Sequence, residues 1–174
     1  MSKAPSGGRA VKRSPKSTER SLSLSLTAHV VQVLAQLRQA NQPADNLLGA
    51  HFKAHRALGP RERNAISEAC FAVLRERSWL THLAKDGPGD EAARARRLAM
   101  LALMVTGAAV TDASPDELAW LHMAQQKPEP SNADDPMRHN LPQWLAQRLH
   151  AQIGEAAWPL AQALLAPAPL DLRV

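Results

Sequence analysis

The chain has 174 residues, 45% hydrophobic and 21% charged, a balance that is typical of a globular domain and excludes a wholly disordered protein. Tyr is absent and only two Phe occur among many Ala and Leu, so strand-favouring residues are scarce and an all-α fold is expected. The formal net charge is +5, but residues 1–20 hold six basic residues against Glu19, which accounts for the whole excess. Nucleic-acid binding by the rest of the chain would therefore depend on the arrangement of its charges.

The first predicted element is a basic tail over residues 1–24, which is rich in Ser, Gly and Pro and is expected to be disordered. Either it only aids solubility or it adds a salt-sensitive attraction to phosphate. Apolar residues at helical spacing then predict a first helix within 26–42 and a second within 45–55. Pro60 suits the first turn of a third helix, where its missing N–H would have had no partner.

The run PRERNAISEACFAVLRERSWLTHLA, residues 60–84, predicts one long third helix. Its apolar stripe includes Cys70, the only cysteine of the chain. We expect Cys70 to be buried and inert, because free cysteine on such a stripe packs as a small hydrophobic group and nothing near it in sequence would lower its pKa. A fourth helix, over residues 91–107, becomes almost wholly apolar and is expected to be the central helix of the core.

A fifth helix is predicted to begin at Ser114, because Pro115 and Glu117 complete the signal of a capping box. Residues 125–140 have three prolines and no apolar pattern, which predicts a loop. Two more helices are predicted, over 141–153 and 155–165, so that about seven helices form one domain over residues 25–165. The alternating run LDLRV, within residues 166–174, is typical of a first strand and predicts the stub of a following subdomain.

Several kinds of site are disfavoured by the sequence. His51 and His55 stand four apart, a spacing that lets two imidazoles share a metal, but no HExxH glutamate separates them and no third ligand is evident. We therefore expect surface histidines and no metal. No glycine-rich phosphate loop follows a strand, so no cofactor is expected in this chain. One cysteine excludes an internal disulfide, and no run approaches the ~18 apolar residues of a membrane span, which favours a cytoplasmic protein with no membrane partner.

Arginines on the third and fourth predicted helices are the candidate binding residues. The planar guanidinium suits phosphate, and a helix N-terminus such as that at Pro60 adds backbone N–H groups. We predict binding to the RNA backbone through six residues: Arg61, Arg63, Arg75, Arg77, Arg94 and Arg97. Interleaved glutamates leave open the alternative that these helices are salt-bridged solvent faces.

Three runs, LGPRERNAISEACFAVLRERSWLTHL, NLPQWLAQRL and ALLAPAPLDLRV, resemble the N-terminal part of bacterial RsmB-type 16S rRNA 5-methylcytosine methyltransferases of the Nop/Sun group. The resemblance covers roughly residues 25–174 and implies a NusB-like RNA-binding helical bundle. The implied partners are 16S rRNA and a catalytic methyltransferase module, which PLDLRV would lead into and which would use S-adenosylmethionine. Arg61, Arg63, Arg75 and Arg77 match basic positions of the family's third-helix run.

The family's Pro-Cys nucleophile motif has no counterpart here, and Cys70 does not match it, so the resemblance implies no catalytic residue in this chain. Two alternatives stay open. One is a free-standing NusB-like transcription antitermination factor that binds RNA and a protein, against which the predicted strand stub argues. The other is a structural domain that only packs on the catalytic module, which the interleaved charges allow.

Overall fold

The computed structural model describes residues 24–39, 42–132 and 134–166. All regular secondary structure in these ranges is helical, with no strand, which confirms the expected all-α class. The predicted strand in LDLRV and the basic tail, apart from its last residue, lie outside the described residues. The NusB-like topology stays a prediction.

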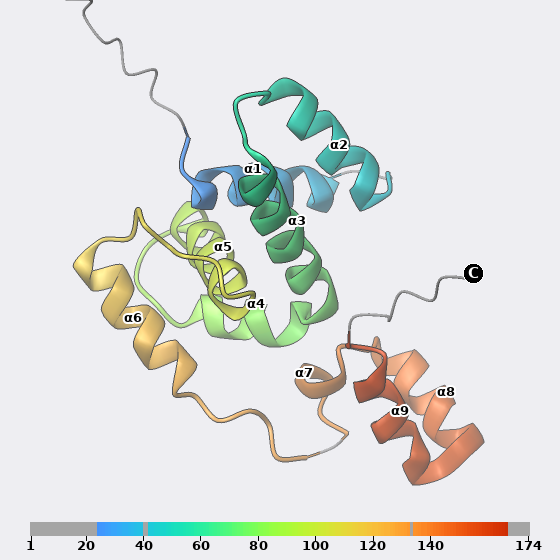
Figure 1. Cartoon of the computed structure of the whole chain (residues 1–174). Coiled ribbons are helices and arrows are strands. Elements are labelled where there is room, and N and C mark those ends of the chain that lie inside the picture. Colours follow the sequence, from blue (N-terminus) through green and yellow to red (C-terminus); the bar gives the residue numbers. More distant parts are fainter. Residues whose placement is uncertain (1–23, 40–41, 133, 167–174) are drawn as a thin grey trace, which may run out of the picture.

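The helices follow one another along the chain and pack as a bundle with a smaller helical group attached at one end (Figure 1). Their bounds are α1 Leu26–Gln39, α2 Ala44–Ala54, α3 Pro60–Arg75, α4 Arg77–Lys85, α5 Glu91–Val105, α6 Pro115–Gln125, α7 Pro136–His139, α8 Gln143–Ile153, the 3₁₀ turn η1 Gly154–Ala156 and α9 Ala157–Ala163. Within the described ranges, none of these helices has both the length and the hydropathy needed to cross a bilayer.

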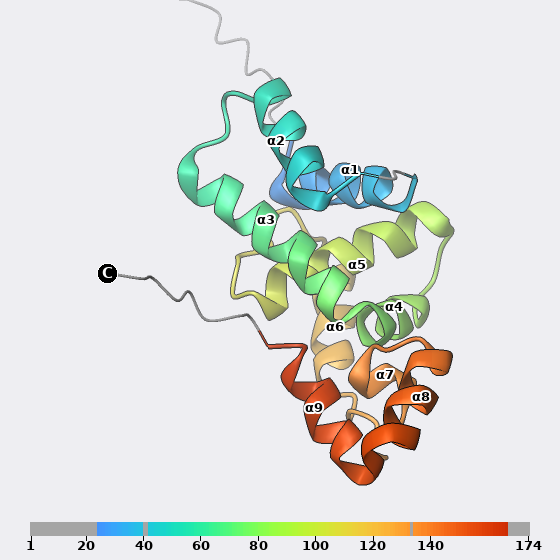
Figure 2. The same ribbon diagram turned by 90° about the vertical axis from the view of Figure 1, so that its right-hand side faces the viewer.

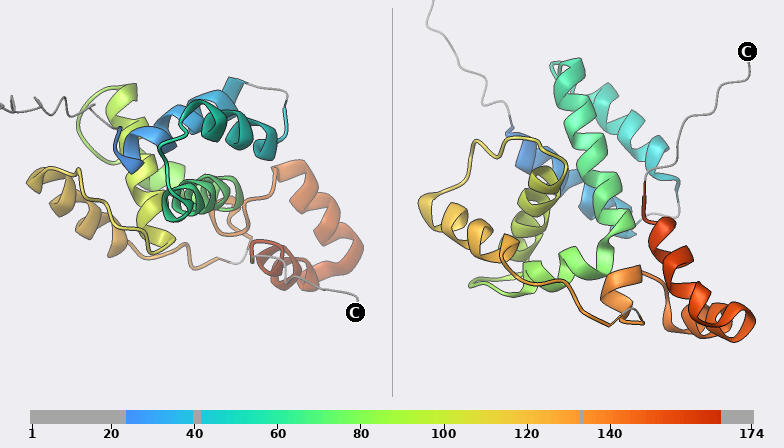
Figure 3. Two further views of the ribbon diagram at one scale, coloured as in Figure 1. Left: turned by 45° about the horizontal axis from the view of Figure 1, so that its top comes forward. Right: turned by 60° about the horizontal axis from the view of Figure 1, so that its bottom comes forward.

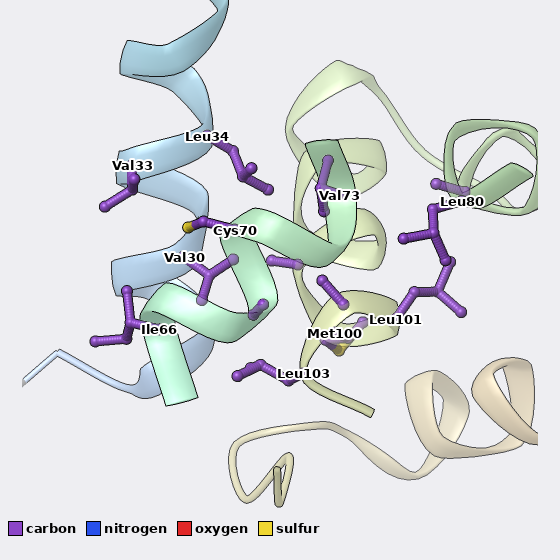
Figure 4. Packing of buried hydrophobic residues seen from close by; sticks show 14 of the residues in the cluster. Val30, Val33, Leu34, Ile66, Cys70, Val73, Leu80, Met100, Leu101 and Leu103 are labelled. Carbon is purple, nitrogen blue, oxygen red and sulfur yellow. The ribbon is translucent and has the colours of Figure 1, made fainter. Parts of the chain in front are cut away.

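Helix α5 is the centre of the core, as its apolar sequence predicts. It packs against α1, α3, α4 and α6, and residues 99–103 are all buried. Figure 4 shows side chains of α1, α3 and α5 meeting in one cluster, with Cys70 of α3 directed toward α1. Burial raises the pKa of the Cys70 thiol to about 12, so the predicted inert, buried cysteine is confirmed.

The predicted helix starts are also confirmed. Pro60 occupies the first turn of α3, where Glu62 accepts a hydrogen bond from the backbone N–H of Gly59. At the start of α6, the Glu117 backbone N–H donates to Ser114 Oγ over 3.2 Å, and the Ser114 N–H donates to the Glu117 carboxylate over 2.8 Å. These reciprocal bonds satisfy donors that the first turn of a helix leaves unpaired.

The single long helix predicted over residues 60–84 is wrong, because the chain breaks at Glu76 into α3 and α4. The backbone there has φ −115° and ψ 32°, and the turn brings α4 back onto α5, which buries Leu80. Asn140 pairs with backbone groups on both sides of the break. Its Oδ1 accepts from the backbone N–H of Ser78 over 2.8 Å, and its Nδ2 donates to the carbonyl of Leu74 over 3.2 Å. A side chain from outside both helices thus satisfies the C-terminal end of α3 and the N-terminal end of α4.

The predicted loop over residues 125–140 contains a short helix, α7. Asp135 accepts a hydrogen bond from the Met137 N–H, Pro136 fills the first position, and Asn140 ends the helix at φ 52°. An Asp-Pro pair is a helix-start signal, so the sequence did hold the cue for this turn.

Helices α8 and α9 pair with each other and meet the rest of the chain through α7, which packs on α4 (Figure 2). Figure 3 shows this pair and α6 on opposite sides of the core. The main apolar cluster of the described residues runs only from Val30 to Ala124. The C-terminal helices therefore form a separate layer beside the core rather than a part of it.

Candidate functional site

The six predicted RNA-binding arginines lie in different environments, and Arg97 is a packing residue. It is only 7% exposed, and its guanidinium donates to the carbonyls of Ala84 over 3.0 Å and Gly87 over 3.2 Å, and to that of Pro88. The Trp120 ring covers it, with the centroid 5.5 Å from Cζ. We therefore correct the prediction for Arg97: its guanidinium does not face solvent, and its hydrogen bonds stabilise the turn between α4 and α5.

Arg63 is half-buried and holds the connection between α2 and α3. Its Nε donates to the carbonyl of Leu58 over 2.9 Å, and its Cζ lies 5.8 Å from the centroid of the Phe52 ring. Another of its donors reaches the Arg56 carbonyl over 3.4 Å. These contacts use two of the five N–H donors and fix the position of the guanidinium, so Arg63 is less free to bind phosphate than an exposed arginine.

Arg61 and Arg75 do not belong to one site. Arg61 is exposed in the first turn of α3, and Arg75 is half-buried in its last turn. They are 14 positions apart, which corresponds to about 21 Å along the helix axis. Neither guanidinium forms an ion pair with any residue in the described part of the chain.

Arg77 and Arg94 do come together, in a groove that we call the arginine groove. The groove has a volume of about 150 Å³ and lies where α1, α3, α4 and α5 meet. A third arginine, Arg38 at the end of α1, lines the same groove. Much of its lining is apolar and includes Leu34, Leu37, Val73, Leu74 and Leu98. Arg38 is not among the arginines predicted from the sequence, because only the packing of α1 against α5 brings it beside the other two.

The arginine groove keeps a positive rim. Its one carboxylate among the lining residues, Glu91, accepts from Arg38 over 3.0 Å and from Arg94 over 2.9 Å. The hydrogen bond from Arg38, helped by the charge of Arg94, holds the pKa of Glu91 below its usual value, so Glu91 stays ionised. Arg77 has no ion pair with any described residue. The lining thus contains one carboxylate and three guanidinium groups, and ion pairs this exposed hold their partners weakly.

Arg96, on the same helix as Arg94, belongs to a half-buried polar network that fixes the fold. Its Nε donates to Glu117 over 2.6 Å and its Nη1 to Asp112 over 3.0 Å. Asp112 also accepts from the hydroxyls of Ser25 over 2.7 Å and Thr27 over 2.6 Å. Burial acts to raise the pKa of Asp112, but these hydrogen bonds outweigh it, and the pKa lies below its usual value. The network ties the start of α1 to α5 and α6.

Three imidazoles, not two, come together between α1 and α2, so the structure supplies a third potential ligand that was not evident in the sequence. His29 of α1 meets His51 of α2 and His55 at its end, and their ligand atoms all lie within 4.8 Å of one another. His51 is only 4% exposed, so the prediction of a surface histidine is wrong there. Burial, with the neighbouring imidazoles, lowers the pKa of His51 to about 4 and also lowers that of His29, which keeps both rings neutral.

The usual α/β type of S-adenosylmethionine site needs a glycine-rich loop between a strand and a helix, which the described residues do not supply. They contain no strand, and so no glycine-rich loop joins a strand to a helix.

No family model matches this chain, and comparisons with curated proteins and with solved structures found no match.

Proposed function

We propose that this chain is an RNA-binding helical domain that positions small-subunit rRNA for an S-adenosylmethionine-dependent cytosine-5 methyltransferase module of the RsmB type. The observation that supports RNA binding best is the arginine groove, in which Arg38, Arg77 and Arg94 from three helices share a lining with apolar side chains. The family assignment within this proposal rests on the resemblance of the three sequence runs alone.

The proposed contact is with the RNA backbone. A guanidinium presents a planar fork that donates two parallel hydrogen bonds to a phosphate, and three such forks line this groove. Glu91 occupies Arg38 and Arg94 in the free protein and gives way to phosphate on binding, while Arg77 is already available. Arg61 and Arg75 remain secondary candidates farther along α3.

The proposed catalytic module would pack on the C-terminal helices. Trp144 of α8 is 64% exposed, and Leu164, just after α9, is 65% exposed; Ile153 and Leu160 are also exposed. Exposed large apolar side chains are typical of contact surfaces, and Leu160 and Leu164, four residues apart, share one side of α9. Methyl transfer and S-adenosylmethionine binding belong to that module in this proposal.

The RNA proposal is tested by the salt dependence of binding. The full chain is titrated into a fluorescent hairpin of small-subunit rRNA at several salt concentrations, and the slope of log affinity against log salt is measured. We expect the double variant Arg77→Gln/Arg94→Gln to bind at least about tenfold more weakly and to lose about one unit of slope for each phosphate contact removed.

Arg148→Gln is the matched control, because Arg148 is an exposed arginine on α8 outside the arginine groove. It should leave the affinity and the slope close to those of the unmodified chain. Equal effects of the groove and control variants, in proteins with the same melting temperature, would show that RNA is not bound at this groove.

A second candidate function, a domain that only packs on its partner module, is favoured by the same exposed apolar residues of α8 and α9. It predicts that the isolated chain binds the rRNA hairpin weakly and with little salt dependence. The titration therefore separates the two proposals.

A further inference from the structure

The histidine cluster formed by His29, His51 and His55 has the geometry of a metal site. His29 Nδ1 and His51 Nε2 lie 3.0 Å apart. Two nitrogens that bind one tetrahedral Zn²⁺ at 2.0–2.1 Å are separated by about 3.3 Å, so this pair is already spaced to share an ion. The third ligand atom, on the half-buried His55, lies within 4.8 Å of both, and rotation of this side chain would close the set.

The backbone supports the same arrangement. His51 and His55 stand four residues apart at the end of α2, which places their rings side by side, with centroids 4.4 Å apart. His29 approaches from α1, with its ring centroid 4.7 Å from that of His55. The carbonyl end of α2 carries a partial negative charge, which favours a cation at this place.

The hydrogen bond between His29 and His51 does not by itself account for the cluster. It uses one nitrogen of each of these two rings and does not involve His55. Three adjacent imidazoles would repel one another if protonated, and two of them, His29 and His51, are almost wholly buried. Neutral imidazole is the form that binds metals.

We propose that His29, His51 and His55 bind one divalent transition-metal ion of the zinc class. Imidazole ligands suit Zn²⁺, Co²⁺, Ni²⁺ and Cu²⁺, whereas Mg²⁺ and Ca²⁺ require oxygen ligands, which this set does not contain. Three ligands leave a fourth tetrahedral position for water or another donor. The ion would join α1 to α2 and so stabilise the N-terminal helix pair.

The test uses the full chain without a histidine tag, freed of metal with a chelator. Titration with Zn²⁺ in a calorimeter should give one ion per chain, and Co²⁺ should give the strong visible absorption of a tetrahedral complex. A concentration of Zn²⁺ about 100 times its dissociation constant should raise the melting temperature by about 5–10 °C.

His55→Gln is the decisive variant, because His55 is half-exposed and lies at a helix end, so the change should not disturb folding. We expect at least about a 100-fold loss of Zn²⁺ affinity and no rise in melting temperature, because loss of a ligand costs more than loss of a supporting hydrogen bond. His122→Gln, on the exposed face of α6, is the control and should bind Zn²⁺ normally. The proposal is overturned if His55→Gln binds as tightly as the unmodified chain, or if the unmodified chain binds no ion.

Discussion

Two arginines on neighbouring helices show how much a single side chain depends on its surroundings. Arg97 is buried against the carbonyls of the α4–α5 turn, whereas Arg77 is exposed at the arginine groove. In the sequence, both arginines lie in segments that are predicted to be helical and that have a similar pattern of charges. Their roles differ because Arg97 meets carbonyls that need a donor, and those carbonyls come from a turn whose path the local pattern does not specify.

The half-buried network around Arg96 makes the free energy of unfolding depend on pH. The hydrogen bond from Arg96 lowers the pKa of Glu117, and the pKa of Asp112 is also below its usual value. A carboxyl with a lowered pKa in the folded state stabilises the fold above its unfolded pKa of about 4. This contribution should be lost as the pH falls below about 4 and through the lower pKa values of the folded state.

We expect Asp112→Asn to lower the free energy of unfolding by about 1–3 kcal/mol at pH 7, because Arg96 and two hydroxyl donors then lose a charged acceptor. Urea unfolding followed by tryptophan fluorescence measures it, and repetition at lower pH should show a weaker acid dependence than in the unmodified chain. Glu129→Gln, an exposed change in the α6–α7 loop, should alter stability by less than about 0.5 kcal/mol. Equal stability of the two variants would mean that the network contributes nothing.

The break between α3 and α4 is the element that the sequence pattern concealed. Local propensity favours a continuous helix, since the run has no Gly or Pro inside it from Arg61 to Ala84. The break is stabilised instead by Asn140, which is 62 residues from Ser78 and 66 from Leu74. A helix end satisfied by a distant side chain leaves no mark at the position where the helix stops.

A graded series at Asn140 tests this capping role. Asn140→Asp keeps the acceptor for Ser78 and should be the mildest change, Asn140→Gly loses all side-chain bonds, and Asn140→Ala also strains the left-handed backbone at φ 52°. We expect losses in unfolding free energy that increase in this order, up to about 3 kcal/mol for Ala. Thermal and urea unfolding measure them, and a mild effect of Ala with a severe effect of Asp would contradict the assignment.

For the molecule as a whole, the apolar core and the C-terminal helices are separable layers. The core cluster of the described residues ends at Ala124, and α8 and α9 reach it through α7. The arginine groove and the histidine cluster both lie within residues 29–98, so both candidate sites belong to the first layer.

A fragment of residues 1–127 should therefore fold alone. We expect a cooperative thermal transition by circular dichroism, with stability lowered by about 1–3 kcal/mol because the bonds of Asn140 are lost. It should keep the salt-dependent RNA binding proposed for the arginine groove, with the full chain as the reference. A fragment without a cooperative transition would show that the C-terminal helices are part of the folding unit.

The helical class, the central position of α5 and the starts of α3 and α6 were all predictable from residues 60–117, because they follow from periodicity and capping within a few residues. Three features were not predictable, because each involves residues far apart in the chain: Asn140 at the α3–α4 break, Arg38 at the arginine groove and His29 beside His51. A local pattern records how a segment folds on itself, but the partners of a buried imidazole, a guanidinium or a helix end are chosen by the packing of whole helices. Both candidate sites arise from that packing, in which α1 is laid across α2 and α5.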